Sequence, residues 1–95
     1  MKYILTIDDD EALCKLVKKC IETEQVPVYT FLRGEDALSF FYQNQNDCVL
    51  VILDIMLPGM DGYSVLEKVR AVSNVPVLML TAKDQEEDKV AGLQN

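Results

Sequence analysis

Acidic side chains and one hydroxyl stand directly after apolar runs of this sequence. The residues concerned are Asp8 and Asp9 after residues 2–7, Asp54 after residues 48–53, and Thr81 and Ala82 after residues 76–80. Carboxylates brought close together repel one another, so a cluster of them is costly without a cation. Mg²⁺ prefers oxygen ligands, usually one or two carboxylates with waters and a phosphate oxygen. The pattern therefore predicts a Mg²⁺ site formed by Asp8, Asp9 and Asp54, with a backbone carbonyl from the loop after Asp54 as a further ligand.

The same residues indicate chemistry at phosphorus. A carboxylate can act as a nucleophile toward a phosphorus centre, forming an aspartyl phosphate, and a metal ion offsets the charge of the two groups. Thr81 could donate a hydrogen bond to a phosphoryl oxygen, helped by the N–H of Ala82. Each residue also has a structural interpretation, because Thr is common in strands and Asp commonly caps turns.

Strands and helices are expected to alternate along the chain. The expected strands are residues 2–7, 27–31, 48–53 and 76–80, and the expected helices are residues 11–24, 34–42, 62–72 and 84–93. Parallel strands need crossover connections, so this order predicts an α/β fold with a doubly wound parallel sheet. Pro27 suits the start of an edge strand, whereas the unbroken apolar run of residues 48–53 indicates a central one. In such sheets the chemistry lies at the carboxyl ends of the strands, where the acids and Thr81 stand.

Three segments resemble the receiver domains of response regulators, which act in two-component signalling. Residues 53–62, Leu-Asp-Ile-Met-Leu-Pro-Gly-Met-Asp-Gly, are similar to the family's phosphorylation-site loop almost letter for letter. Residues 7–10, Ile-Asp-Asp-Asp, resemble the acidic pair after its first strand, and residues 80–82, Leu-Thr-Ala, resemble its hydroxyl residue after the fourth. The segments occur in the family's order and at its separations, and the resemblance runs over the whole chain.

The resemblance implies a flavodoxin-like sheet with strand order 2-1-3-4 and a signalling role, such as transcription regulation, rather than a turnover enzyme. It implies that Asp54 accepts a phosphoryl group from a histidine kinase. Asp8, Asp9, Asp54 and the backbone carbonyl of Met56 would hold Mg²⁺. Thr81 would be the switch hydroxyl, with the N–H of Ala82 beside it.

The sequence also departs from the family's pattern. The family continues into a fifth strand with a lysine and a fifth helix, whereas this sequence stops at Asn95, and Lys83 comes too early to be that lysine. We therefore expect residues 1–95 to form a receiver domain that is incomplete at its C-terminus. The fourth strand would be an apolar sheet edge, which is a template for pairing with another chain. A homodimer or a larger assembly is expected, with slow phosphorylation.

Composition excludes several other classes of protein. A chain of 95 residues fits one small domain, and a net charge of −7 disfavours direct binding to nucleic acid or an anionic membrane. No apolar run is long enough to span a bilayer, and the N-terminus lacks the features of a signal peptide, which predicts a cytoplasmic protein. Cys14, Cys20 and Cys48 lack a spacing motif and the chain has no His, so three buried thiols are expected rather than disulfides or zinc. Tyr63 is likewise expected to pack.

Two other functions remain open at this point. A Mg²⁺-dependent phosphohydrolase also uses an aspartyl nucleophile, but it needs a second carboxylate two residues later, where this sequence has Met56. It also needs a lysine late in the chain, and none follows Lys89. The other alternative is a receiver-like binding or oligomerisation module that is not phosphorylated, because the fifth unit is missing.

Overall fold

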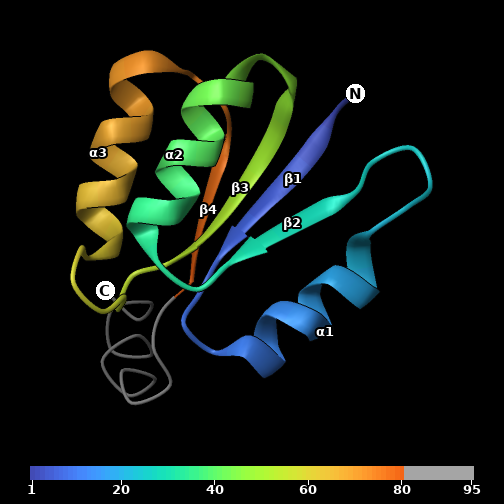
Figure 1. Cartoon of the computed structure of the whole chain (residues 1–95), viewed down its shortest axis with the longest axis horizontal. Helices are drawn as coiled ribbons and strands as arrows, with labels where there is room; N and C mark the ends of the chain where they lie inside the picture. Colours follow the sequence, from blue (N-terminus) through green and yellow to red (C-terminus); the bar gives the residue numbers. More distant parts are fainter. Residues whose placement is uncertain (81–95) are drawn as a thin grey trace, which may run out of the picture.

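The computed structural model describes residues 1–80 of the chain (Figure 1). Its elements in chain order are β1 (Tyr3–Ile7), α1 (Glu11–Ile21), β2 (Val28–Phe31), α2 (Gly34–Asn44), a 3₁₀ turn (Gln45–Asp47), β3 (Cys48–Asp54), α3 (Gly62–Val72) and β4 (Val77–Leu80). Thr81, Ala82 and the helix expected at residues 84–93 lie outside this range. No helix within residues 1–80 is long and apolar enough to cross a membrane.

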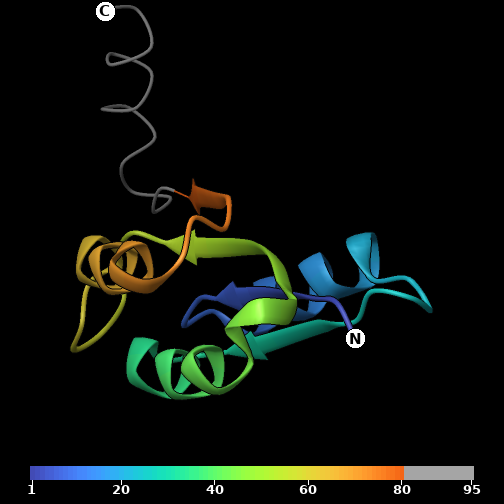
Figure 2. The ribbon, with the colours of Figure 1, turned by 90° about the horizontal axis from the view of Figure 1, so that it is seen from above.

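The four strands form one parallel sheet in the order β2-β1-β3-β4. Helices α2 and α3 cover one face of this sheet and α1 covers the other (Figure 2). The doubly wound α/β fold and the strand order 2-1-3-4 expected from the sequence are therefore confirmed. β2 is an edge strand, as its leading proline indicated: Pro27 has no N–H to offer, but its carbonyl accepts a hydrogen bond from the N–H of Ile4 at 2.9 Å.

The main core lies between the sheet and the pair α2 and α3. Alternate strand residues point to opposite faces of a sheet, so β1 and β3 each send every second side chain into this core. Its fully buried members include Leu5, Val51, Leu53, Phe41 of α2 and Val65 of α3. β3 is buried from Val51 to Asp54 without a break, because it lies inside the sheet with helices on both faces.

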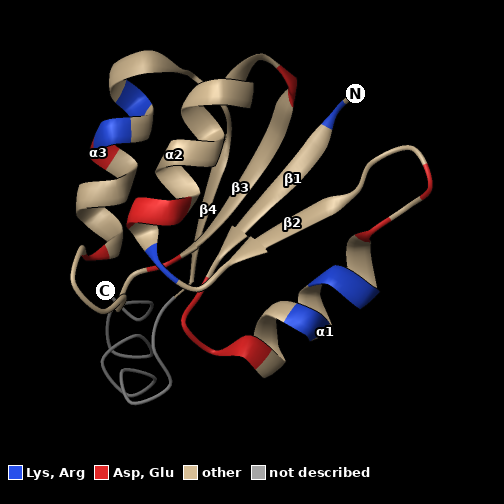
Figure 3. Ribbon diagram, viewed as in Figure 1, with Lys and Arg blue, Asp and Glu red and all other residues tan. Residues whose placement is uncertain are grey.

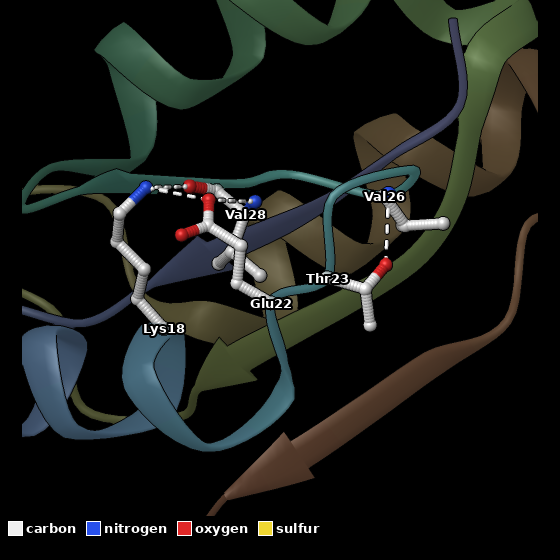
Figure 4. A network of polar contacts seen from close by, with 5 residues as sticks. All are labelled: Lys18, Glu22, Thr23, Val26 and Val28. Carbon is white, nitrogen blue, oxygen red and sulfur yellow. Dashed lines mark hydrogen bonds and ion pairs between the residues drawn. The ribbon is translucent and has the colours of Figure 1, made fainter.

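Helix α1 ends at Ile21, earlier than the sequence indicated, because Glu22 is held by the next strand. The Glu22 carboxylate accepts hydrogen bonds from Lys18 Nζ at 2.8 Å and from the Val28 N–H at 3.0 Å (Figure 4). Lys18 Nζ also donates to the Val28 carbonyl at 2.8 Å. In the following turn, Thr23 Oγ1 accepts from the N–H of Val26 at 3.0 Å. These contacts end the helix at Ile21 and lead the chain into β2.

Three other expectations about elements and burial were wrong. α2 extends to Asn44 rather than ending at residue 42, because the Asn44 side chain donates back to the Phe40 carbonyl at 2.9 Å, and residues 45–47 follow as a 3₁₀ turn. Cys14 and Cys48 are buried, but Cys20 is exposed on α1. Tyr63 does not pack into the core, since 62% of it is exposed on the first turn of α3.

Candidate functional site

Parallel pairing of β1 with β3 brings two of the predicted acids to one edge of the sheet. Ile7 lies opposite Leu53 in the register, so Asp8 directly after β1 stands beside Asp54 at the end of β3. One carboxylate oxygen from each of Asp8, Asp9 and Asp54 lies within 4.8 Å of the others. We call these three residues the acidic cluster. Figure 3 shows acidic residues at the ends of both strands, on the same edge of the sheet.

Two members of the acidic cluster are buried and oriented by backbone amides. Asp8 is 4% exposed and Asp54 is 7% exposed, whereas Asp9 faces solvent. Asp8 Oδ1 accepts a hydrogen bond from the N–H of Asp10 at 2.9 Å, and Asp54 Oδ1 accepts one from the N–H of Met56 at 3.2 Å. These bonds fix the two carboxylates before any ligand arrives.

Burial makes both carboxylates harder to ionise. Removal from water raises the pKa of Asp8 to about 6, the nearby charges of Asp54 and Asp9 add to the effect, and the Asp10 N–H opposes it. The pKa of Asp54 is also raised, first by burial and further by the charge of Asp9, against the lowering effect of the Met56 N–H. The sequence indicated that these carboxylates would repel one another, and that repulsion does contribute to the raised pKa values, but burial is their larger cause.

The donor set of the acidic cluster fits a hard divalent cation such as Mg²⁺. All three side chains offer carboxylate oxygens, the ligand type that Mg²⁺ prefers. Two of the carboxylates are removed from water and lie close to a third, an arrangement that a bound dication would stabilise. Receiver domains generally bind Mg²⁺ at an acidic pocket of this kind.

The loop from Ile55 to Asp61, between β3 and α3, is held tightly to the end of β3. The N–H of Gly62 donates to the Ile55 carbonyl at 2.8 Å and closes the loop. A Cβ on Gly62 would overlap the Asp54 carbonyl oxygen and lie 2.6 Å from the Ile55 Cα. Leu57 is buried and anchors the loop in the core. Glycine at position 62 is therefore required for α3 to begin so close to Asp54.

Some predicted site residues cannot be placed in the same way. Thr81 and Ala82 lie outside the described residues, so their parts in the site stay predictions. Met56 lies next to the acidic cluster, because its N–H donates to Asp54 Oδ1. The metal-binding role of its carbonyl stays a prediction.

Asp10 and Cys14 support the site, and neither was among the predicted site residues. The Asp10 side chain caps α1 by accepting from the Leu13 N–H at 3.1 Å, while its own N–H orients Asp8. The buried Cys14 thiol donates to the Asp8 carbonyl at 3.3 Å. An acidic residue just before an amphipathic helix was a usable signal for the cap, whereas nothing in the sequence marks the thiol.

Comparison with known proteins agrees with this fold. Residues 4–95 match the family described as response regulator receiver domain. A response regulator receiver domain protein from Clostridium thermocellum has a similar structure, with a TM-score of 0.80 and 23% identity over 99% of this chain and 75% of that one.

Two further solved structures are similar at higher identity. The receiver domain of the Francisella response regulator 1452 is 30% identical, with a TM-score of 0.73 over 99% of this chain and 77% of its own. The BeF3-activated N-terminal receiver domain of Klebsiella pneumoniae RstA is 27% identical, with a TM-score of 0.76 over 98% and 78%. The family match covers nearly the whole chain, and the fold and the acidic edge of the sheet agree with it. This chain therefore belongs to the response regulator receiver domains, the signalling modules of two-component systems.

Proposed function

We propose that this chain accepts a phosphoryl group on Asp54 from the phosphohistidine of a histidine kinase, in the presence of Mg²⁺. The observation that carries the proposal is the convergence of Asp54 with Asp8 and Asp9, with one oxygen of each within 4.8 Å of the others. Family membership supports it, because receiver domains are signalling modules that interact with histidine kinases. The similar Klebsiella pneumoniae RstA receiver domain exists in a BeF3-activated form, which supports a domain that can be switched to an activated state.

The proposed reaction is a direct transfer between two side chains. An oxygen of the Asp54 carboxylate attacks the phosphorus as the phosphorus–nitrogen bond to the kinase imidazole breaks. The electron pair of that bond stays on the imidazole nitrogen, which leaves as neutral histidine after taking up a proton. The result is an aspartyl phosphate on Asp54, a modification of the chain itself rather than a released product.

The residues around Asp54 have separate tasks in this proposal. The Met56 N–H donates to Asp54 Oδ1 at 3.2 Å and so orients the carboxylate that would attack phosphorus. Asp8, Asp9, Asp54 and the Met56 carbonyl would hold Mg²⁺, which would neutralise charge on the attacking and transferred groups when bound. Thr81 and the N–H of Ala82 would contact the transferred phosphoryl group. A cytoplasmic location, where such a kinase domain would meet this chain, stays part of the proposal.

A second function, self-association through β4, is favoured by one observation. β4 pairs with β3 and with no other strand among residues 1–80, and Leu78 on it is 53% exposed. An apolar strand with a free edge is a template for a second copy. We propose a homodimer or larger assembly formed there, with or without phosphorylation.

Replacement of Asp54 by asparagine tests the phosphoacceptor directly. Asp54→Asn keeps an oxygen for the Met56 N–H but removes the nucleophilic carboxylate, so a phosphorylated histidine kinase should no longer label the chain. Asp61→Asn is the matched control, because Asp61 lies in the same loop and its cap to the Ser64 N–H at 2.8 Å can be kept by asparagine. Undiminished labelling of Asp54→Asn at the same peptide would refute the assignment.

A further inference from the structure

The end of β2 holds the backbone of Asp8. Ile7 lies opposite Phe31 in the parallel register, and the Asp8 N–H donates to the Phe31 carbonyl at 3.0 Å. The chain then turns through Leu32 and Arg33 and enters α2 at Gly34. The backbone of Asp8, one member of the acidic cluster, is therefore fixed to the segment that leads into α2.

The start of α2 also packs against α3 and against the loop of residues 55–61 that follows Asp54. A Cβ on Gly34 would lie 2.7 Å from Val65 Cγ2 and 3.7 Å from the Met60 carbonyl oxygen. Met60 belongs to the loop of residues 55–61, which Figure 2 shows reaching from the end of β3 toward the first turn of α2. The absence of a side chain at position 34 lets α2 approach this loop closely.

An ion pair lies directly on the tip of that loop. Arg33 Nη2 and Glu35 Oε2 are 3.6 Å apart. Gly59 faces them with a φ of +76°, and a Cβ there would lie 3.3 Å from Glu35 Oε2 and 3.6 Å from Arg33 Nη2. Glycine at this position both adopts the left-handed conformation and leaves room for the two charged groups.

We infer that Arg33 and Glu35 are positioning residues for the acidic cluster, because their ion pair packs against the loop at Gly59 and follows closely after Phe31, whose carbonyl holds the Asp8 backbone. A shift of the loop at Gly59 would also move Met56, because the Gly62–Ile55 hydrogen bond closes the loop and Met56 lies within it. The Met56 N–H orients Asp54, so the carboxylate would move as well. The inference rests on the proposed function, because it concerns the same metal site.

Neutralising each partner separately distinguishes positioning from a long-range charge effect. Arg33→Gln removes a positive charge and Glu35→Gln removes a negative one, so a pure charge effect would strengthen Mg²⁺ binding in the first variant and weaken it in the second. Loss of positioning weakens binding in both, by about two- to five-fold, the range expected for an exposed pair. Lys68→Gln, an exposed residue of α3, controls for loss of a positive charge alone.

The experiment is Mg²⁺ titration of the 95-residue chain by calorimetry, together with amide hydrogen exchange of Met56 in the metal-free protein. We expect both single variants to weaken Mg²⁺ binding and to speed Met56 exchange. Arg33→Lys and the exchanged pair Arg33→Glu with Glu35→Arg should restore both readouts.

Three results would overturn the inference: opposite effects of the two single variants on Mg²⁺ affinity, Met56 exchange at the parent's rate in both, or no recovery in the exchanged pair. If the parent chain binds no Mg²⁺, the proposed function fails on its own, and Met56 exchange in metal-free protein still decides whether the pair holds the loop.

Discussion

Among single residues, Asp8 links the chemistry of the site to the stability of the fold. Its pKa is raised to about 6 in the folded chain, so the native state holds a proton that the unfolded chain releases near its ordinary value of about 3.9. The free energy of unfolding of metal-free protein should therefore fall as pH rises from about 4 through about 6, by at most about 3 kcal/mol. Urea unfolding at a series of pH values would measure this slope.

Asp8→Asn supplies the control for the pH prediction. Asparagine keeps an oxygen for the Asp10 N–H but does not titrate, so this variant should lose most of the slope and be more stable than the parent above pH 6 without metal. Mg²⁺ should stabilise the parent more than the variant, because it binds the native carboxylates. The same slope in both proteins would mean that another group causes it.

The identities of the three clustered acids were predictable from the sequence, but their environment was not. Asp8 and Asp54 follow apolar runs, and the carboxyl ends of parallel strands meet at one edge, so their convergence follows from local pattern and topology. How deeply each carboxylate is buried depends on how β1 and β3, which are far apart in the sequence, pack beside each other in the sheet. The sequence therefore pointed to repulsion between the carboxylates, whereas their raised pKa values arise mainly from burial.

At the level of elements, the junction of β3 with α3 depends on a glycine. Gly62→Ala would push a methyl group into the Asp54 carbonyl oxygen and the Ile55 Cα. We expect a loss of about 1–3 kcal/mol in the free energy of unfolding, the usual cost of overpacking a fitted site, together with weaker Mg²⁺ binding as Asp54 moves. Chemical denaturation and Mg²⁺ titration of the variant would check the two effects.

Glu67→Ala, at an exposed position of the same helix, should change stability by less than about 0.5 kcal/mol. A Gly62→Ala protein as stable as this control would show that the start of α3 can shift away from Asp54 without cost.

The positions of the elements were predictable where hydrophobic pattern decides them, and less so at their ends. Helix α3 spans residues 62–72 as expected, because Gly62 and an inward-facing stripe define it. The end of α1 was misplaced because it depends on Glu22 reaching across to the Val28 N–H, a contact between segments that pattern alone does not show. Cys20 lies in a helical stripe of apolar residues and is nevertheless exposed, because the sheet covers only part of that stripe.

For the whole molecule, the edge of β4 that pairs with no strand among residues 1–80 leads to a prediction about assembly. Leu78→Lys places a charge on this strand, and charged edge residues discourage pairing between sheets. The parent should form dimers or larger assemblies as concentration rises, and Leu78→Lys should shift this equilibrium toward monomer. Light scattering over a dilution series would measure both.

Leu32→Lys is the matched control for assembly, because Leu32 is 43% exposed but lies in the turn after β2, away from β4. The Leu32→Lys variant should associate at the same concentrations as the parent chain. A parent chain that stays monomeric at high concentration would rule out association through β4.

The overall fold was the most predictable feature, because alternating strands and helices leave few arrangements of a parallel sheet. The order β2-β1-β3-β4 agrees with the expectation from family resemblance. That order also brings the acids after β1 and β3 together, so fold and site support the same account.

The proposal on which the others depend is phosphorylation of Asp54 with the help of a divalent cation. Its most direct test is the intact mass of the parent and of Asp54→Asn after incubation with a small phosphodonor, with Mg²⁺ and with excess chelator. We predict the mass of one added phosphoryl group on the parent with Mg²⁺, little or none with chelator, and none on Asp54→Asn under either condition. An unmodified parent in the presence of Mg²⁺, or equal modification of Asp54→Asn, would contradict the claim.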